Sequence, residues 1–538
     1  MEVELKLSLA PQDAEALRQH PLLKQYAMST PYEQDMSDTY FDTPDLQFRH
    51  CDAGLRVRRL DTNDWIQTLK GGGSVDGGLH SRHEWESRLA GSEPDLAALR
   101  KMVDHKSAWG KLLRSPQIEE QLAPIFTTRV RRMVWDLRLP QGDEVECVLD
   151  QGRVELADRN IPISEVELEL KSGDPAHLFD FALSLQQDIP LQIGNLSKAD
   201  RGYALLAPQP PAAVKATRVK LSKRMSIEQA FQAIVANCMA HIQANAAGVA
   251  QALDVESVES LHQMRVGLRR LHSALGLFQD VLRTPEDLQS ELDWLGTQLD
   301  AARDWDVLAG TTLPALADTL PYQAGLAKGL DNSLANELDN ELADGLADGL
   351  AELRLAALDQ AHEQHQVAAL AVGSARYTRL LLRFTRWLQG CDWRRFMAPR
   401  DQRDLTARIP VFARRSLEYY QRRLLKRGGK LDAANPEARH RVRIAAKKAR
   451  YANEFFGSLY QTKKVKRYVA ALARLQDELG WLNDAAVADG LLAQLRDGQP
   501  GREHGAGLVR GYLASRVKND DKHILSLWRK FKPLKLPC

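Results

Sequence analysis

This sequence has few cysteines, no long apolar run and almost no net charge. Its five cysteines are odd in number and far apart, which argues against a disulfide framework or a zinc site and favours free thiols in a reducing compartment. No stretch approaches the roughly 18 continuous apolar residues that a membrane helix needs, and no basic segment with an apolar run follows Met1. We therefore expect a cytoplasmic protein that has no membrane partner.

The bulk composition is that of a large soluble protein. At 538 residues the chain is too long for a single hydrophobic core, so two or more domains are expected. The formal net charge of +2 is the difference between 73 basic and 71 acidic residues, and these are segregated along the chain. The local charge patterns are therefore more informative than the overall charge.

Residues 1–205 consist mainly of short segments of alternating polarity, separated by turn residues such as Gly71-Gly72-Gly73 and Gly77-Gly78. The segments with helical character are 11–20, 95–103 and 175–187. The predicted strands are residues 1–7, 37–42, 54–60, 65–70, 81–89, 127–139, 144–150, 153–156 and 163–171. This pattern predicts an α+β domain dominated by antiparallel sheet.

After residue 205 the pattern changes. Residues 206–217 are rich in proline and alanine and lack hydrophobic periodicity, which predicts an extended linker. Residues 218–530 have long helical periodicity and predict an all-α helical bundle. An acidic stretch near 329–353 predicts a partly helical insertion that serves as a solvated spacer. We expect the first domain to fold without the second.

The predicted bundle contains an internal repeat, in which cationic residues recur with identical spacing. The paired segments are His262-Gln263-Met264-Arg265 with His440-Arg441-Val442-Arg443, Arg269-Arg270 with Lys447-Lys448, and Arg303-Asp304 with Asn483-Asp484. Repetition of this kind predicts two related helical halves.

Two of the predicted strands carry carboxylates on one face. Successive side chains of a strand point to opposite faces, so Glu2 and Glu4 share a face with Lys6. In the same way, residues 165–171 place three glutamates and Lys171 on one face. An ordinary half-buried strand also alternates, with its charges facing water. Carboxylates this dense on neighbouring strands would repel one another unless cations lie among them, which indicates a divalent-metal site.

Cationic side chains recur on the other strands. Arg56 shares a face with Arg58, and Arg129 with Arg131, while apolar residues such as Val57 occupy the opposite faces. If the sheet closes into a barrel with the apolar faces outward, the charged faces line its lumen. Such a lumen suits a polyanion with metal ions, because arginine and lysine bind phosphate oxygens and carboxylates bind Mg²⁺ or Mn²⁺.

The charged strands resemble, in order, the motifs of the CYTH superfamily of triphosphate tunnel metalloenzymes. The motifs are Glu2-x-Glu4-x-Lys6, Tyr40-Phe41-Asp42-Thr43, Leu55-Arg56-Val57-Arg58, Gln67-Thr68-Leu69-Lys70, Arg82-x-Glu84-x-Glu86, Leu149-Asp150-x-Gly152, Glu165-x-Glu167-x-Glu169-x-Lys171 and Ser197-Lys198-x-x-Arg201-Gly202-Tyr203. The resemblance spans the whole first domain. It implies an eight-stranded antiparallel tunnel in which a divalent metal, Mg²⁺ or Mn²⁺, supports hydrolysis of a triphosphate.

The same resemblance implies a role for each charged position. The implied metal ligands are Glu2, Glu4, Glu167 and Glu169, followed by Asp150 and Glu165. The implied substrate contacts are Lys6, Arg56, Arg58, Lys70, Arg82, Arg129, Arg131, Lys171 and Arg201. The implied catalytic residues are Lys6, Glu4 and Asp150.

The repeated basic motifs resemble the CHAD domain, a histidine-rich α-helical module that binds inorganic polyphosphate. The implied polyphosphate contacts are His262, Arg265, Arg269, Arg270, His440, Arg443, Lys447 and Lys448. A solvated helix face would explain one such stripe, but not its duplication. Nucleic acid is the generic partner of a basic surface, yet no nucleic-acid motif is present, so no nucleic acid is expected. A histidine beside phosphate should be held protonated.

Taken together, the two resemblances predict a metal-dependent inorganic triphosphatase with a polyphosphate-binding module. It would convert tripolyphosphate to pyrophosphate and phosphate in the cytoplasm, including at polyphosphate granules. Three alternatives remain open. The same tunnel would suit an adenylate cyclase or a thiamine triphosphatase, and a non-catalytic protein could use it only to bind polyphosphate.

Overall fold

A computed structural model describes residues 2–60, 64–208, 210–251, 255–318, 333–432, 435–495 and 500–538. The chain divides into two compact units, each described by itself below. The barrel unit comprises Met1–Pro210 and Gly373–Asp392, and the helical unit comprises Pro211–Val372 and Trp393–Cys538. The described residues of 210–222 form no helix or strand.

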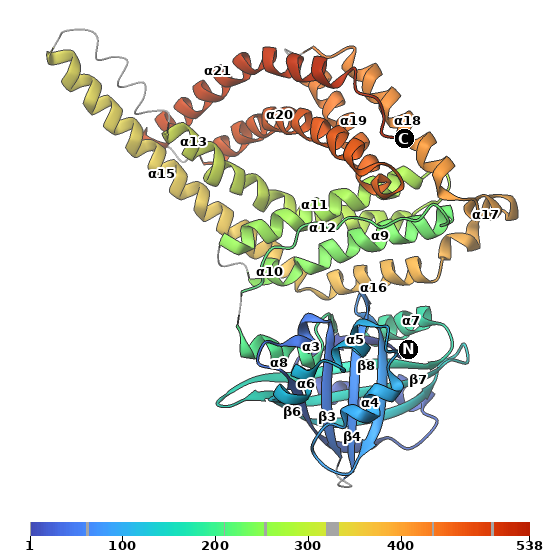
Figure 1. Cartoon of the computed structure of the whole chain (residues 1–538). Coiled ribbons are helices and arrows are strands. Elements are labelled where there is room, and N and C mark those ends of the chain that lie inside the picture. The colour runs from blue at the N-terminus through green and yellow to red at the C-terminus, as the bar shows by residue number, and fades with distance from the viewer. Residues whose placement is uncertain are drawn as a thin grey trace. The chain divides into compact units, whose positions relative to one another are not determined.

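The barrel unit is built on a closed antiparallel sheet (Figure 1). Its strands are β1 (Glu2–Ser8), β2 (Tyr32–Asp42), β3 (Ala53–Leu60), β4 (Trp65–Asp76), β5 (Leu79–Leu89), β6 (Ala123–Arg138), β7 (Glu144–Leu156), β8 (Arg159–Ser172) and the short β9 (Gln192–Ile193). The order is β5-β4-β3-β2-β6-β7-β8-β1, with β9 also on β1, and a β5–β1 pairing closes the ring. The expected eight-stranded antiparallel tunnel is therefore confirmed.

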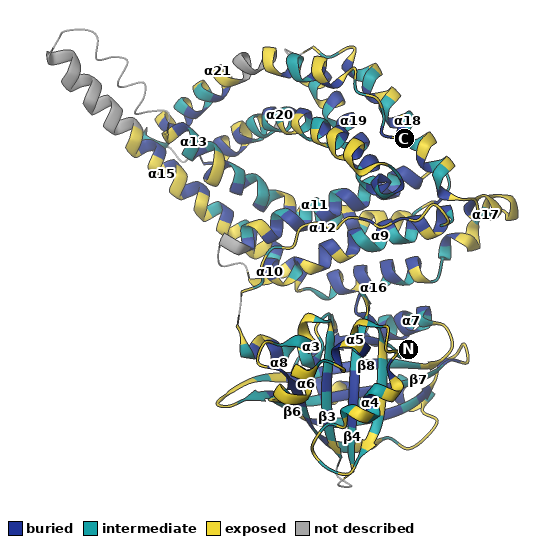
Figure 2. Ribbon diagram, in the orientation of Figure 1, coloured by how far each residue is buried: buried dark blue, intermediate teal, exposed yellow. Residues whose placement is uncertain are grey.

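Alternation along the strands separates an apolar outer layer from a charged lumen. Leu5 and Leu7 of β1 are fully buried in one core with residues of the short helices that cover this side of the barrel. A second core contains Leu55, Val57 and Leu69. The covering helices are η1 (Pro11–Asp13), α1 (Ala14–Arg18), α2 (Pro21–Tyr26), α3 (Gln47–His50), α4 (Leu96–Met102), α5 (Ala108–Leu112), α6 (Pro116–Gln121), α7 (Pro175–Leu185) and α8 (Lys198–Leu206). The buried strands beneath exposed helices are visible in Figure 2.

Of the two glycine-rich segments that the sequence predicted as turns, one is a turn and the other lies within β4. Gly71, Gly72 and Gly73 lie within β4 at a shift in the β4–β5 register, so they form a bulge rather than a turn. Gly73 has φ +111°, and a Cβ there would lie 1.8 Å from the Ser81 carbonyl oxygen, so only glycine fits. Gly77-Gly78 is the hairpin turn, as expected, and both residues have positive φ. Strand β7 is also continuous, whereas the sequence predicted a break after residue 150.

One helix of the barrel unit comes from the second half of the chain. Helix α16 (Ala375–Gln389) packs against α7 and β9. Leu382 of α16 is fully buried in the same apolar core as Leu7. The sequence predicted that the first domain would be complete at residue 205, and the presence of α16 was not foreseen.

The helical unit has the internal duplication that the sequence predicted. Its first half contains α9 (Ile227–Ala244), α10 (Ala246–Gln251), α11 (Val255–Phe278), α12 (Glu286–Val307), η2 (Leu308–Thr312), α13 (Leu313–Ala317) and α15 (Ser333–Val372). The second half contains α17 (Pro399–Leu405), α18 (Ile409–Gly428), α19 (Pro436–Phe455), η5 (Gly457–Leu459), α20 (Thr462–Gln494) and α21 (Pro500–Phe531), preceded by η4 (Asp392–Phe396). Equivalent helices meet across the two halves: α11 packs on α19, α12 on α20 and α15 on α21.

The predicted acidic insertion lies partly in α15. Residues 333–353 belong to this 40-residue helix, and residues 329–332 lie outside the described part of the chain. Leu350 and Leu353 are buried in a core with residues of α20 and α21, so this end of the stretch packs and is not a solvated spacer. Within the described residues, no helix combines the length and apolarity needed to cross a membrane.

Candidate active site

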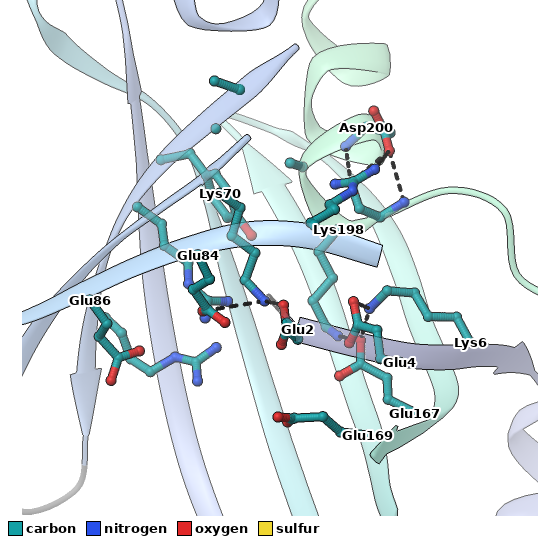
Figure 3. A pocket seen from close by; sticks show the side chains of 18 of the residues that line it. Glu2, Glu4, Lys6, Lys70, Glu84, Glu86, Glu167, Glu169, Lys198 and Asp200 are labelled. Carbon is teal, nitrogen blue, oxygen red and sulfur yellow. Dashed lines mark hydrogen bonds and ion pairs between the residues drawn. The ribbon is translucent and has the colours of Figure 1, made fainter. Parts of the chain in front are cut away.

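The barrel encloses a cavity of about 600 Å³ that is lined mostly by charged residues (Figure 3). The charged lining residues are Glu2, Glu4, Lys6, Arg49, Asp52, Arg56, Arg58, Lys70, Arg82, Glu84, Glu86, Arg132, Glu146, Glu167, Glu169, Lys171, Lys198 and Asp200. They come mainly from α3, α8 and every long strand of the ring except β2, which contributes the uncharged Tyr40. The lumen therefore brings together cations and carboxylates that are up to about 200 residues apart in the sequence.

Carboxylates of β1 and β8 face each other inside the cavity. Glu4 of β1 lies opposite Glu169 of β8 in the strand pairing. Burial raises the pKa of the Glu169 carboxyl, and the nearby Glu2 and Glu146 carboxylates add to this, although Lys171 opposes the shift. A carboxyl group in this setting gains from a bound cation, so Glu2, Glu4 and Glu169 have the donor chemistry of a Mg²⁺ or Mn²⁺ site.

A second acidic group lies deeper in the wall. Ligand atoms of Asp150, Glu165 and Glu167 lie within 4.8 Å of one another, and all three residues are buried. Lys198 of α8 contacts all three carboxyls, at 2.7 Å from Asp150 and 3.0 Å from Glu167. Arg132 lies 2.6 Å from Asp150 and 3.0 Å from Glu167. Lys6 also contacts Glu167, and Arg201 contacts Glu165. Several protein cations therefore already neutralise this group, whereas Glu2 and Glu4 of β1 each contact a single lysine.

These cations set the ionisation of the deep group. Burial alone would raise the pKa of Glu167, yet Lys198, Lys6 and Arg132 hold it well below its usual range. Arg132 and Lys198 likewise lower the pKa of Asp150 against the effect of burial. The structure therefore places Asp150 and Glu165, which the sequence assigned to metal, in ion pairs behind the cavity wall. Glu167 is shared, since it also lines the cavity.

Six of the predicted substrate contacts line the cavity: Lys6, Arg56, Arg58, Lys70, Arg82 and Lys171. The buried Asp38 orients two arginines of β3, at 2.7 Å from Arg58 and 3.3 Å from Arg56. Lys70 lies 2.6 Å from Glu2, and Lys171 lies 2.8 Å from Glu169. Most of the cations thus contact a neighbouring carboxylate and point into one space.

Three of the predicted substrate contacts lie elsewhere. Arg129 and Arg131 project outward, with side chains 68% and 63% exposed, and pair with Glu155 and Asp35. Their two side chains do share a face, but that face is the outside of the barrel, and Arg132 is the inward cation of β6. Arg201 contacts Glu165 at 2.6 Å in the deep acidic group.

Sequence reasoning also missed several lining residues. Lys198 belongs to the motif that begins at Ser197, but the sequence analysis predicted no metal-binding, substrate-binding or catalytic role for it. Arg49 was missed because it comes from α3, outside any strand pattern. The buried Asp42 carboxyl accepts hydrogen bonds from the Arg49 backbone NH at 3.1 Å and the Tyr203 hydroxyl at 2.7 Å, which places Arg49 beside α8.

In the helical unit, the two basic stripes meet because α11 packs on α19. Burial and the cations Arg269, Arg443 and Lys448 lower the pKa of Lys447 to about 8. Burial and crowding by cations, Arg303 first among them, lower the pKa of His262 to about 4. The buried Nε atoms of Arg265 and Arg269 and Nδ1 of His262 have no hydrogen-bond partner. Crowded cations with unmatched donors are suited to an anion.

Two residues of the predicted stripes have other surroundings. Arg270 is 4% exposed, donates to Asn237 Oδ1 at 2.8 Å and lies over the Phe455 ring. Its side chain therefore packs between helices. His440 is exposed and lines a separate groove with Arg439 and Arg443. The lowered pKa of His262 means that this side chain is neutral at pH 7 in the protein alone. That a histidine is protonated when phosphate lies beside it stays a prediction.

Comparison with known proteins also separates an N-terminal from a C-terminal region, but it assigns residues 373–392 of the barrel unit to the C-terminal region. Residues 1–203 match the family model of the CYTH domain, and residues 233–493 match that of the CHAD domain. The inorganic triphosphatase of Haemophilus influenzae is 35% identical over 205 residues, which are 38% of this chain and 54% of that protein. The chain thus matches about half the length of this relative.

Two solved structures are also similar. The crystal structure of the CHAD domain from the plant Ricinus communis shares 34% sequence identity, covers 61% of this chain and 99% of that chain, and has a TM-score of 0.50. A protein from Hippeastrum, described with a dominant triphosphatase activity, shares 20% identity, covers 38% of this chain and 96% of that chain, and has a TM-score of 0.28.

Proposed function

Because the chain joins a CYTH domain at residues 1–203 to a CHAD domain at residues 233–493, we propose that it is a metal-dependent inorganic triphosphatase with a polyphosphate-binding module. The single observation that carries the proposal is the closed lumen in which Glu2, Glu4 and Glu169 face a set of arginines and lysines. Binding a polyanion requires only the cations. The additional carboxylates support metal-assisted hydrolysis over simple binding.

We assign Mg²⁺ or Mn²⁺ to the carboxylates of β1 and β8. Glu2, Glu4 and Glu169 offer hard oxygen donors, and Glu167 completes this wall of the cavity. Bound there, the metal would neutralise phosphate oxygens and polarise the attacking water. Lys198 and Arg132 hold Glu167 ionised and in place, so their role is to position a metal ligand. On the same grounds, Asp150 and Glu165 are proposed to act on the site through Lys198.

The cations supply the substrate site. Arg56 and Arg58 present guanidinium groups that can bind phosphate oxygens in pairs, while Lys6, Lys70, Arg82 and Lys171 add positive charge around the same space. In the proposed reaction, the oxygen of a water molecule bonds to a terminal phosphorus while the bond from this phosphorus to the bridging oxygen breaks. The water gives up a proton to solvent, and phosphate and pyrophosphate are the products. Negative charge that builds on the phosphate oxygens and on the leaving group is stabilised by these fixed cations.

For the helical unit, we propose polyphosphate as the ligand of the paired stripes. Arg265, Arg269, Arg443 and Lys447 supply positive charge in a partly buried setting, where Lys447 loses its proton unusually easily. A chain of phosphates would relieve this repulsion and satisfy the unmatched arginine donors. Such a module would retain the enzyme in the cytoplasm at polyphosphate granules.

The decisive experiment compares products from three substrates. Purified full-length protein with Mg²⁺ is given tripolyphosphate, ATP and thiamine triphosphate in parallel, and products are identified by ³¹P NMR. The proposal expects pyrophosphate and phosphate from tripolyphosphate, with turnover lost in EDTA. A cyclic nucleotide from ATP would instead establish the cyclase, and preferred cleavage of thiamine triphosphate would establish that substrate. Tight binding of tripolyphosphate without turnover would leave a non-catalytic binding protein.

A further inference from the structure

Helix α16 is an integral part of the barrel unit, although its residues lie within the CHAD segment of the sequence. Leu382 is fully buried in the apolar core that also contains Leu7 of β1. The Gln186 side chain donates to the Ala375 carbonyl at 2.9 Å, and Gln192 donates to the Gly373 carbonyl at 3.0 Å. The start of α16 is therefore hydrogen-bonded to the segment that runs from α7 to β9.

The last turn of α16 is held by charge. Arg386 Nε lies 2.9 Å from both carboxylate oxygens of Asp180 in α7, and Arg386 Nη1 donates to Asp392 at 2.7 Å. Burial opposes the charge, but the hydrogen bonds to Asp392 and Asp180 raise the pKa of Arg386. Hydrogen bonds of this kind, with both partners ionised, are stronger and more directional than neutral ones. The orientation of α16 on the barrel is thus defined at both of its ends.

Between these anchors, α16 meets the turn that joins β4 to β5. Thr385 is 4% exposed and lies directly beneath Gly77, since a Cβ added to Gly77 would come within 2.3 Å of Thr385 Oγ1. Gly77 has φ +63°. No other residue would allow both this backbone conformation and this close approach without strain. The position of the turn therefore depends on the shape of the Thr385 side chain.

The same turn is bonded to a residue of the cavity. The Lys6 backbone NH donates to the Gly78 carbonyl at 2.9 Å, and the Lys6 carbonyl accepts from the Gly194 NH at 2.9 Å. The Lys6 ammonium lies 3.0 Å from Glu4 and also contacts Glu167. A continuous chain of contacts therefore runs from Thr385 through the Gly77-Gly78 turn to Lys6.

We propose that α16 positions Lys6 for the reaction: Thr385 supports the Gly77-Gly78 turn, and the turn holds the backbone of β1 where Lys6 and Glu4 project into the lumen. Thr385 is thus a positioning residue that the second half of the chain contributes to the tunnel. The predicted effect on kcat rests on the proposed function. The predicted support of β1 by Thr385 does not, because amide exchange can test it in the absence of any activity.

The test substitutes Thr385 in the full-length protein. Thr385→Leu is too large for the space beneath Gly77 and should displace the turn, whereas Thr385→Val keeps the shape without the hydroxyl. Arg379→Ala, on the exposed face of the same helix, is the matched control. Thr385→Ala, which only removes contacts, is the milder variant if Thr385→Leu does not fold.

Two readouts are taken for each variant. Because local opening of the turn would free the Lys6 NH, we expect amide exchange at Lys6 to accelerate about tenfold in Thr385→Leu, with β6 and β7 unchanged. Because small displacements of reacting groups are costly, kcat for tripolyphosphate should fall by about tenfold while KM changes less than about twofold. Thr385→Val and Arg379→Ala should resemble the parent protein in both readouts.

The outcomes separate this inference from the proposed function. Unchanged exchange at Lys6 in both Thr385→Leu and Thr385→Ala would overturn the inference, and so would faster exchange with unchanged kcat. An equal loss in Thr385→Val would also overturn it, because the shape argument predicts that valine suffices. If the parent protein cleaves no triphosphate, the proposed function fails, while the exchange at Lys6 still decides whether α16 positions β1.

Discussion

Glu4 and Glu169 occupy directly opposite positions on the antiparallel strands β1 and β8. Like charges in such a pair are destabilising. The ion pairs of Lys6 with Glu4 and of Lys171 with Glu169 reduce this repulsion in part. An added cation between the two carboxylates would relieve the remaining repulsion, which agrees with the proposed metal site.

Metal binding should depend on pH through Glu169. Its raised pKa means that the carboxyl takes up a proton at a higher pH than an ordinary glutamate, so affinity for Mn²⁺ should begin to fall at a higher pH than the pKa of an ordinary glutamate would give. Calorimetric titration with Mn²⁺ checks this. Glu169→Gln should bind Mn²⁺ more weakly and lose much of the pH dependence. A full pH dependence in Glu169→Gln would assign the titration to another group.

Replacing Arg132 by alanine should lower the stability of the protein far more than replacing Arg129, although the two residues are only three positions apart. Arg132→Ala leaves Asp150 and Glu167 buried with one cation fewer, which should cost about 3 to 5 kcal/mol of stability. Arg129→Ala, an outward residue, should change the free energy of unfolding by less than about 0.5 kcal/mol. Urea unfolding, with amide exchange of β6 and β7 as the signal, measures the stability change in each of the two variants. Similar losses in the two variants would contradict the orientation of β6.

The carboxylates and the guanidinium groups should affect different kinetic constants. Glu4→Gln removes a metal-binding charge, so kcat for tripolyphosphate should fall and higher Mg²⁺ should be needed for half-maximal rate. Arg56→Ala removes a phosphate contact, so KM should also rise. The binding free energy lost with one such contact is about 1.5 to 3 kcal/mol. Arg138→Ala, exposed outside the barrel, is the control. Parent-like kinetics in both site variants would remove β1 and β3 from the active site.

Polyphosphate binding should weaken in alkaline solution. Because the pKa of Lys447 is lowered to about 8, this side chain loses its charge as pH rises from 7 to 9, although a bound polyanion will move the transition upward. Lys447→Arg keeps the charge and should flatten the pH profile measured by fluorescence anisotropy with labelled polyphosphate. Affinity should also fall steeply with salt. A pH profile that is the same in parent and Lys447→Arg proteins would exclude Lys447.

A chain shortened to residues 1–207 should be less stable than the same unit in the full protein. It lacks Leu382, whose removal from a core costs about 2 to 5 kcal/mol when only the side chain is lost, and it leaves Asp180 without Arg386. Thermal unfolding of the shortened chain, with and without added residues 373–392 as a peptide, is the measurement. Equal stability without the peptide would show that α16 is dispensable.

Much of this protein could be predicted from sequence because its signals are local. The period of two along a strand identifies which residues share a face, so the pairing of Glu2 with Glu4 and of Arg56 with Arg58 required no coordinates. The identical spacing of His262 to Arg269 and His440 to Lys447 likewise predicted two related helical halves. These patterns depend on backbone geometry alone, which every strand or helix of that sequence must obey.

Only the tertiary structure decided which faces look inward and which charges are already paired. The period of two does not tell whether Arg131 or Arg132 points inward, because the closure of the barrel determines which face of β6 lines the lumen. Lys198 reaches Asp150 from a helix 48 residues later, and Leu382 enters a core whose other members all lie before residue 192. Contacts over such sequence distances leave no periodic signal, since they depend on where separate elements pack and not on the conformation of either one.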